Sequence, residues 1–229
     1  MSDGPLVLII EDELPIRRFL RASLDGEGYR VAEADSGERG LRIAAQQPPD
    51  LVILDLGLPD MDGQQVLVRL REWLTAPVIV LSARDQESQK VRALDSGAND
   101  YVTKPFGVAE FLARIRTALR QAAQGQEASP LFKVGELQVD LAARQVVIRQ
   151  QPVHLTPREY KLLSVLVKHA GRVLTHRFLL KEVWGPGHAD ETHSLRVFMA
   201  GLRRKLEEDS ARPRYLLTEP GVGYRLAGE

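Results

Sequence analysis

Short apolar runs separated by amphipathic stretches fill the first half of this chain and constrain its fold more than any other feature. Almost continuously apolar residues occupy Leu6–Ile10, Leu51–Leu54 and Val78–Leu81, as expected of parallel strands that are buried on both faces. Shorter runs lie at Tyr29–Ala34 and Tyr101–Thr103. Because helical patterns alternate with these runs, the sequence predicts a doubly wound α/β domain with a five-stranded parallel sheet of flavodoxin-like topology.

A polar segment separates this first domain, residues 1–121, from the rest of the chain. Residues 122–130 contain Gly, Pro and small or polar side chains without hydrophobic periodicity, which is typical of a flexible linker. We therefore expect a second domain over residues 131–229.

The second domain begins with strand patterns and continues with helices. We expect antiparallel strands at Lys133–Val139 and Arg144–Arg149. A helix should follow Thr156, because a Thr N-cap, a Pro after it and Glu159 three residues later form a strong helix start. A second helix should follow Thr175.

The end of the chain carries a third helix and a hairpin. The helix is expected from about Glu191 to Glu208, and the hairpin joins Tyr215–Thr218 to Tyr224–Leu226. Strands, three helices and a terminal hairpin together predict an α+β winged helix-turn-helix domain.

The zero net charge hides a difference between the two domains. Residues 1–121 carry 15 Lys and Arg against 19 Asp and Glu, whereas residues 131–229 carry 16 against 11. This division indicates that only the second domain binds a polyanion such as double-stranded DNA. The chain has no cysteine, no signal-peptide pattern and no apolar run of roughly 20 residues. We therefore expect a cytoplasmic protein that does not enter a membrane.

Chemically useful side chains stand where the expected parallel strands end. They are Glu11 and Asp12 after the first strand, Asp55 at the end of the third, Ser82 at the end of the fourth and Lys104 after the fifth. The carboxyl ends of parallel strands meet at one edge of the sheet, so these residues should converge. An acid such as Asp55, which ends an apolar strand, needs a partner, either a metal ion or Lys104.

The charges of these residues predict phosphoryl chemistry. Three neighbouring carboxylates favour a hard divalent cation such as Mg²⁺, which would neutralise the charge of an incoming phosphoryl group. Asp55 could attack phosphorus and form an aspartyl phosphate while Lys104 pairs with a phosphoryl oxygen. Ser82 is placed to donate a hydrogen bond to the new phosphoryl group.

These residues, together with the triplet Lys104–Phe106, make the first domain resemble the receiver domain of two-component response regulators. The resemblance covers essentially all of residues 5–121. It implies that a sensor histidine kinase donates the phosphoryl group. It also implies a cis peptide bond between Lys104 and Pro105.

The same resemblance assigns roles around the phosphoacceptor. Ser82 and Tyr101 look like the family's switch pair, in which the Tyr ring moves inward when the phosphoryl group recruits the Ser hydroxyl. The implied ligands of Mg²⁺ are Asp12 and Asp55 directly, the Gly57 carbonyl, and Glu11 through water.

Charges on the last two helices of the first domain resemble the OmpR/PhoB-type subfamily, whose active receivers dimerise through this face. The resemblance implies a homodimer on activation. Asn99 stands where relatives usually carry an acid, so one ion pair should be missing. The pairs implied across a two-fold axis are Lys90 with Glu110, Asp100 with Arg114, and Asp95 with Arg116.

The third helix of the second domain has an apolar face and an opposite face of small and basic residues. Its apolar residues recur at helical spacing from Leu195 to Leu206 and should pack on the core. A helix anchored in this way suits entry into a DNA major groove. We expect Arg196 and Arg204 near the bases and Arg203 at phosphate. The expected contact residues on this helix are His193, Arg196, Val197, Ala200, Arg203 and Arg204.

The terminal hairpin resembles the wing of the same subfamily. Its tip carries Glu219, which opposes deep entry into the minor groove and leaves Thr218 and Arg225 as phosphate contacts. The loop Gly185–Glu191 is where subfamily members contact RNA polymerase, so that partner is implied as well.

Three other functions fit the residues of this chain less well. A phosphohydrolase with an aspartyl nucleophile usually needs a second acid two residues later, where this chain has Gly57. A flavin protein of the same topology would have a phosphate-binding loop in place of the acids Glu11–Glu13. A DNA-binding regulator that does not depend on phosphorylation would not need the intact acidic pocket.

Three short strings resemble, in particular, the response regulators of high-affinity potassium-transport (Kdp) operons. This resemblance implies that the chain controls such an operon. The strings are Arg17–Arg21, Asp55–Asp60 and Trp184–Gly187.

Overall fold

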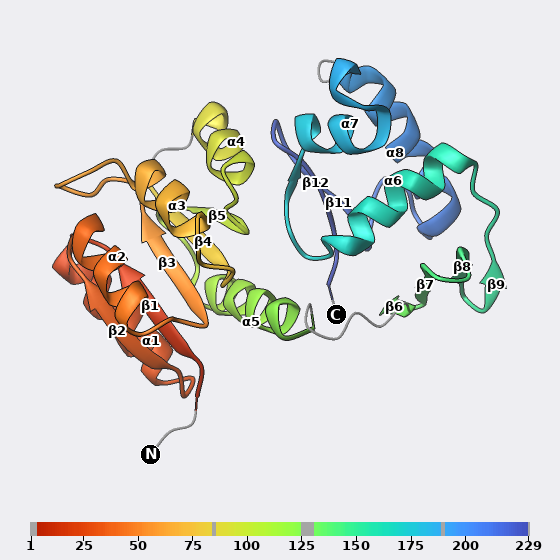
Figure 1. The fold of residues 1–229 in the computed structure, drawn as a ribbon. Helices are drawn as coiled ribbons and strands as arrows, with labels where there is room; N and C mark the ends of the chain where they lie inside the picture. Colours follow the sequence, from red (N-terminus) through yellow and green to blue (C-terminus); the bar gives the residue numbers. More distant parts are fainter. Residues whose placement is uncertain (1–3, 84–85, 125–130, 189–190, 229) are drawn as a thin grey trace. The chain divides into compact units, whose positions relative to one another are not determined.

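The computed structural model describes two compact units. They comprise residues 1–123 and 124–229, and each is described by itself (Figure 1). Most of the expected linker lies outside the described residues. The described ranges are 4–83, 86–124, 131–188 and 191–228.

A parallel sheet forms the centre of the first unit. In the described residues its strands are β1 (Leu6–Ile10), β2 (Arg30–Ala34), β3 (Leu51–Asp55), β4 (Val78–Ser82) and β5 (Asp100–Thr103). They lie in the order β2-β1-β3-β4-β5 and all pair in parallel. This order is the flavodoxin-like one, so the sequence prediction of the fold is confirmed. All residues of β1, β3 and β4 are buried, because helices cover both faces of the sheet.

Helices connect these strands. Those of the described residues are α1 (Leu14–Asp25), α2 (Gly37–Gln46), α3 (Gly63–Arg71), α4 (Glu87–Asp95) and α5 (Val108–Gln124). Leu24 of α1 and Phe111 of α5 share one core with Ile9 and Ile53 of the sheet. Because α5 continues to Gln124, the helix reaches into the first residues of the expected linker. Within the described residues, no helix combines the length and apolar character needed to cross a bilayer.

Short antiparallel strands open the second unit. They are β6 (Leu131–Val134), β7 (Leu137–Asp140), β8 (Gln145–Ile148) and β9 (Gln151–Pro152). The single strand expected at Lys133–Val139 is wrong, because the chain turns between β6 and β7 at Gly135, whose φ is +52°. The strand expected at Arg144–Arg149 is shorter than predicted and covers only Gln145–Ile148. Arg144 and Arg149 have positive φ (55° and 49°) and lie in turns.

The three helices expected in the second unit are present. They are α6 (Pro157–Lys168), α7 (His176–Trp184) and α8 (Thr192–Leu206), with a 3-10 turn at Pro186–His188. The side chain of Thr156 accepts a hydrogen bond from the Glu159 amide, and the Glu159 carboxylate accepts one from the Thr156 amide. This reciprocal pair confirms the expected capping box.

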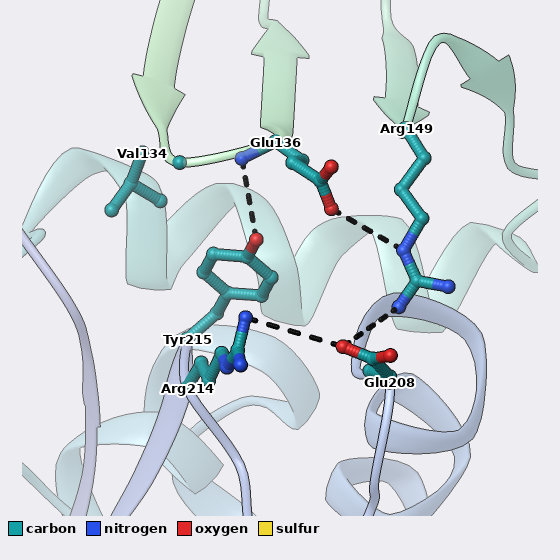
Figure 2. A pocket seen from close by; sticks show the side chains of 7 residues that line it. Val134, Glu136, Arg149, Glu208, Arg214 and Tyr215 are labelled. Atoms are coloured by element: carbon teal, nitrogen blue, oxygen red, sulfur yellow. Dashed lines mark hydrogen bonds and ion pairs between the residues drawn. The ribbon is translucent and has the colours of Figure 1, made fainter.

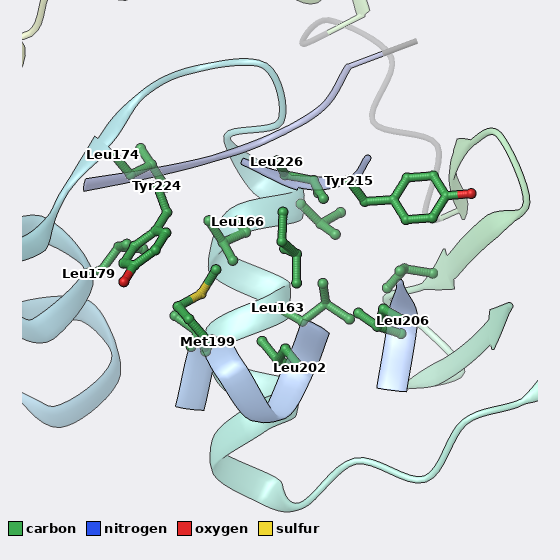
Figure 3. Packing of buried hydrophobic residues seen from close by; sticks show 14 of the residues in the cluster. Leu163, Leu166, Leu174, Leu179, Met199, Leu202, Leu206, Tyr215, Tyr224 and Leu226 are labelled. Atoms are coloured by element: carbon green, nitrogen blue, oxygen red, sulfur yellow. The ribbon is translucent and has the colours of Figure 1, made fainter. Parts of the chain in front are cut away.

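A hairpin closes the second unit. Its strands are β11 (Leu216–Glu219) and β12 (Gly223–Leu226), and β12 also pairs with β10 (Leu174–Thr175). Figure 3 shows Leu163 of α6 and Met199 and Leu202 of α8 packed in the core beneath this hairpin. The helices and the hairpin form the winged helix that the sequence predicts.

Candidate functional site

The carboxyl edge of the parallel sheet gathers the side chains that end or follow its strands. Glu11 follows β1, Asp55 ends β3 and Lys104 follows β5. Ser82, at the end of β4, pairs in register with Thr103 of β5, and its carbonyl accepts the Lys104 amide over 2.8 Å. Glu11, Asp55 and Lys104 therefore meet at this edge as expected, while a contact of the Ser82 hydroxyl with a phosphoryl group stays a prediction.

Lys104 is the partner of the buried acid at the end of β3. Its Nζ lies 2.9 Å from Asp55 Oδ1 and donates to Glu11 Oε2 over 2.8 Å. Glu13 Oε1 lies 3.9 Å from the same nitrogen. Asp55 is 6% exposed and Glu11 is fully buried, so the ammonium offsets the cost of placing two carboxylates away from water. The peptide bond between Lys104 and Pro105 is cis, as expected.

Burial and pairing change the acidity of two groups at this edge. Burial raises the pKa of Glu11, and the neighbouring Asp55 raises it further, although the hydrogen bond from Lys104 opposes the rise. Burial by itself would lower the pKa of Lys104, but hydrogen bonds to Glu11 and Asp55 outweigh it and raise that pKa. Lys104 therefore keeps its positive charge at neutral pH.

Three carboxylates at this edge could hold a metal ion. Glu11, Asp12 and Asp55 each offer an oxygen, and these oxygens lie within 4.8 Å of one another. Mg²⁺ prefers hard oxygen ligands and usually takes one or two carboxylates, with water completing its octahedral shell. The donor set therefore fits a magnesium ion.

Two glycines shape the loop after β3. The Gly57 amide donates to Asp55 Oδ2 over 2.7 Å, on the carboxylate whose Oδ1 faces Lys104. A Cβ at Gly63 would lie 2.4 Å from the Asp55 carbonyl oxygen, so only glycine fits at the start of α3. Gly57 is exposed beside Asp55, and metal binding by its carbonyl stays a prediction.

The residues expected as a switch pair lie on adjacent strands and are both buried. Ser82 is 2% exposed and Tyr101 is 7% exposed. Lys90 Nζ lies 5.9 Å from the centre of the Tyr101 ring. The ring is thus already inside the fold, and its movement on phosphorylation stays a prediction.

A carboxylate without an expected role anchors the loop after β3. Asp60 accepts hydrogen bonds from the Gly37 and Glu38 amides, each over 2.8 Å, and so caps the N-terminus of α2. These backbone bonds, the one from Glu38 first, lower the pKa of Asp60. The sequence holds no signal for this cap, because Gly37 and Glu38 are 23 and 22 residues away from Asp60 along the chain.

Part of the charge expected at a dimer interface is engaged within the chain. Arg114 Nη1 lies 2.6 Å from Asp100 Oδ2, and Arg114 Nη2 lies 2.7 Å from Glu110 Oε1. Burial alone would lower the pKa of Arg114, but these two acids raise it well above its usual range. The ion pair expected between two protomers thus forms inside one of them.

The remaining residues of that face are placed as follows. Arg116 pairs with Glu27 over 3.3 Å in the same chain, whereas Asp95 lies at the end of α4. Asn99 Oδ1 accepts hydrogen bonds from Arg71 (2.7 Å) and from the Val78 amide (3.0 Å). The side chain of Asn99, which stands where relatives usually carry an acid, therefore links Arg71 of α3 to the start of β4.

The outward face of α8 is open, as expected for a surface that meets DNA. The side chains from Leu195 to Leu206 at helical spacing are buried in the core, and Val197 is 53% exposed. A large apolar side chain held in solvent on a helix with basic neighbours is a candidate for contact with base edges. The exposed residues of the expected set on α8 are His193, Arg196, Val197, Ala200 and Arg204.

Three other residues expected at DNA are tied to the fold. Arg203 donates to the Leu216 carbonyl over 2.9 Å and to the Thr218 hydroxyl over 2.7 Å, so it joins α8 to β11. Arg225 on β12 forms an ion pair of 2.6 Å with Glu219. Contacts of these groups with phosphate stay predictions.

A cavity of about 540 Å³ lies elsewhere in the second unit (Figure 2). Arg149 pairs there with Glu136 at 3.3 Å and with Glu208 at 3.9 Å, and Arg214 lies 4.0 Å from Glu208. The Tyr215 hydroxyl accepts the Glu136 amide over 3.2 Å. Because these charges pair with one another, the cavity has no evident preference for a ligand, and the acidic edge is the better candidate site.

Both units match known protein families. Residues 7–116 match the response regulator receiver domain, and residues 150–226 match the C-terminal domain of transcriptional regulatory proteins. Receiver domains bind Mg²⁺ at an acidic pocket. Proteins with this pair of domains are transcriptional regulators whose chemistry is limited to phosphotransfer on the receiver, which removes the phosphohydrolase and flavin alternatives.

Similar proteins cover almost the whole chain. The KDP operon transcriptional regulatory protein KdpE of Escherichia coli is 55% identical over 220 residues, which are 96% of this chain and 98% of that protein. The transcriptional regulatory protein KdpE of Mycobacterium tuberculosis is 55% identical over 222 residues, with the same coverage. The structure of DrrB, an OmpR/PhoB homologue from Thermotoga maritima, is 28% identical with a TM-score of 0.51 over 98% of this chain and 100% of that one. The chain therefore belongs to the two-component response regulators of the OmpR/PhoB type, and within them to the KdpE-like transcriptional regulators.

Proposed function

We propose that this protein regulates transcription of a potassium-transport operon when Asp55 is phosphorylated by a sensor histidine kinase. The observation that carries the proposal is the 2.9 Å contact between Lys104 Nζ and Asp55 Oδ1 beside two further carboxylates. The operon is proposed from the near-full-length identity of 55% to two KdpE proteins. The proposed partners, the phosphorylated kinase domain and the DNA, are both in the cytoplasm. We therefore propose that the protein is cytoplasmic.

Asp55 is the nucleophile of the proposed reaction. One of its carboxylate oxygens attacks phosphorus, so an oxygen–phosphorus bond forms as the bond between phosphorus and the kinase histidine nitrogen breaks. The Gly57 amide and Lys104 hold the two oxygens of Asp55. Lys104 then pairs with a phosphoryl oxygen, and Ser82 donates a hydrogen bond to another.

Glu11, Asp12, Asp55 and the Gly57 carbonyl would hold a magnesium ion at this edge. Such an ion supplies positive charge against the oxygens of the transferring phosphoryl group. The ammonium of Lys104 alone cannot balance three carboxylates and an incoming phosphoryl group. Phosphorylation of Asp55 should therefore require a divalent cation.

The proposed output is a DNA-binding homodimer. Ser82 and Tyr101 would transmit the effect of phosphorylation to the face formed by α4, β5 and α5. Two protomers would associate through this face. We propose RNA polymerase as a further partner at the loop Gly185–Glu191, part of which lies outside the described residues. The dimer residues proposed are Lys90, Asp95, Asp100, Glu110, Arg114 and Arg116. The DNA contacts proposed are His193, Arg196, Val197, Ala200, Arg203, Arg204, Thr218 and Arg225.

Phosphorylation is tested directly by mass spectrometry. Purified protein incubated with acetyl phosphate and MgCl₂ should gain the mass of one phosphoryl group, and chelation of the metal with EDTA should prevent the gain. Asp55→Ala should gain nothing. Equal modification of wild type and Asp55→Ala would place the phosphoryl group on another residue and refute the proposal, whereas no modification of either protein would favour a regulator that does not depend on phosphorylation.

Genome-wide DNA capture tests the output. Wild type should occupy a potassium-transport promoter, and Asp55→Ala should occupy it less. Equal occupancy by the two proteins would mean that DNA binding does not depend on phosphorylation of Asp55.

A further inference from the structure

Arg17 of α1 contacts the loop that presents two of the three carboxylates of the acidic site. Its Nη1 donates to the Glu11 carbonyl over 2.6 Å and to the Asp12 carbonyl over 3.1 Å. One guanidinium nitrogen thus joins the two consecutive residues whose side chains reach the site. The reaction proposed above gives Arg17 no part, because its hydrogen bonds are with backbone carbonyls and not with the reacting groups.

The surroundings of Arg17 hold it in this position. Its side chain is only 14% exposed, and its Nε lies 3.9 Å from Glu33 Oε1 on β2. The Glu11 amide donates to the Ala34 carbonyl of β2 over 3.0 Å. The loop after β1 is therefore fixed from α1 on one side and from β2 on the other.

Restraint of this loop matters because magnesium tolerates little error in ligand position. Mg²⁺ requires near-octahedral ligands at about 2.0–2.1 Å. Glu11, Asp12 and Asp55 repel one another, so a loose loop would let the first two move away from Asp55, and binding of the ion would have to bring them back. Groups that orient the ligands of a metal commonly change its affinity by about 10–100-fold.

We infer that Arg17 is a positioning residue for the magnesium site, which it supports by clamping the Glu11 and Asp12 peptide groups. The inference rests on the proposed function, because it concerns the same metal site. Electrostatics alone predicts the opposite effect of the residue: a guanidinium near the site repels a divalent cation, so its removal would strengthen binding. The two accounts differ in sign and can be separated.

The experiment compares Arg17→Gln with Arg18→Gln in the full-length protein. Arg18 is the next residue of α1, is exposed, and its side chain makes no hydrogen bond or ion pair with the described residues. Both variants remove one positive charge from the same helix. Calorimetric titration with MgCl₂ gives the Kd, and phosphorylation by acetyl phosphate is followed as a function of Mg²⁺ concentration.

We expect Arg17→Gln to raise the Kd for Mg²⁺ about tenfold and Arg18→Gln to leave it unchanged or slightly lower. The Mg²⁺ concentration for half-maximal phosphorylation should rise with the Kd, while the rate at saturating Mg²⁺ stays near that of wild type. General damage to the receiver would lower that saturating rate as well.

Equal affinities in the two variants, or tighter binding by Arg17→Gln, would overturn the role of Arg17 and leave the proposed function intact. Absence of Mg²⁺ binding by wild type would instead overturn the proposed function. If a thermal melt shows that Arg17→Gln is unfolded, Arg17→Lys and Arg18→Lys take the place of the Gln variants. Weaker Mg²⁺ binding by Arg17→Lys then supports the clamp, and equal binding refutes it.

Discussion

At the scale of single residues, the space at Gly63 determines how closely α3 approaches the phosphoacceptor. A Cβ there would lie 2.4 Å from the Asp55 carbonyl oxygen and 2.6 Å from the Leu56 Cα. Both are backbone atoms, which cannot move aside as a flexible side chain can. We predict that Gly63→Ala lowers the free energy of unfolding by about 1–3 kcal/mol, measured by urea denaturation, and slows the phosphorylation of Asp55.

Gly107→Ala is the matched control for this substitution. Nothing lies within 4 Å of a Cβ at Gly107, whose carbonyl accepts the Phe111 amide at the start of α5, so only the lower preference of Ala for a helix N-cap, worth about 0.5 kcal/mol, should reduce the free energy of unfolding. Equal losses in the two variants would mean that crowding at Asp55 is not the cause.

Asp60 should make the stability of the receiver depend on acid. Backbone hydrogen bonds, first the one from the Glu38 amide, lower its pKa below the ordinary value of 3.8, so the ionised carboxylate favours the folded state. That contribution is complete above pH 3.8 and is lost as the pH falls through the lower folded value. We predict that Asp60→Asn is less stable than wild type at neutral pH and that the difference narrows below pH 3.8. Urea denaturation across pH measures it, and a difference that does not vary with pH would contradict the role of the carboxylate.

At the scale of elements, α8 carries arginines with separable tasks. Arg203 is bound to Leu216 and Thr218 of β11, whereas Arg204 is exposed. The proposed contact of Arg204 near the bases brings its exposed charge to the DNA, so Arg204→Ala should weaken binding and reduce the slope of log K against log salt by up to about 0.9. Arg203→Ala should weaken binding at all salt concentrations by releasing the hairpin, with a smaller change in slope, because the charge that Arg203 offers to phosphate is shared with Leu216 and Thr218.

Fluorescence anisotropy over a range of KCl concentrations measures both slopes. The probe is a labelled duplex that carries the promoter recovered by genome-wide capture. Equal slope changes in the two variants would mean that Arg203 also leaves its partners to meet phosphate.

The elements also explain which parts of the site the sequence could predict. Asp55 was predictable because it ends a strand whose apolar character is plain, and because parallel strands bring their carboxyl ends to one edge. The turn inside Lys133–Val139 was not, since it depends on the positive φ of Gly135, a torsion that the pattern of apolar residues does not specify.

Contacts distant in sequence were the least predictable. Asp60 caps a helix that begins 23 residues earlier, and Arg114 selects Asp100 in its own chain. Many acids and arginines lie on exposed surfaces, and only the folded structure decides which of them meet. The sequence therefore indicated which charged residues were candidates for a role, but it did not indicate which residues they contact.

At the scale of the whole molecule, phosphorylation should change the oligomeric state. Beryllofluoride mimics the phosphoryl group on the Asp55 carboxylate, so with Mg²⁺ it should convert a monomer into a dimer in sedimentation velocity experiments. Asp55→Ala should remain monomeric under the same conditions. A wild-type protein that is monomeric in both states would refute association through the face of α4, β5 and α5.

The engagement of Arg114 by two acids of its own chain has a consequence for which partners this regulator accepts. In the proposed dimer, Arg114 can bind Asp100 of the other protomer only by giving up or sharing a contact that it already has, so the exchange adds little affinity. A related receiver without the matching acid would leave Arg114 with the two acids of its own chain, so this arginine gives the proposed dimer little means of rejecting such a receiver. Discrimination between receivers would then have to come from other residues of the face.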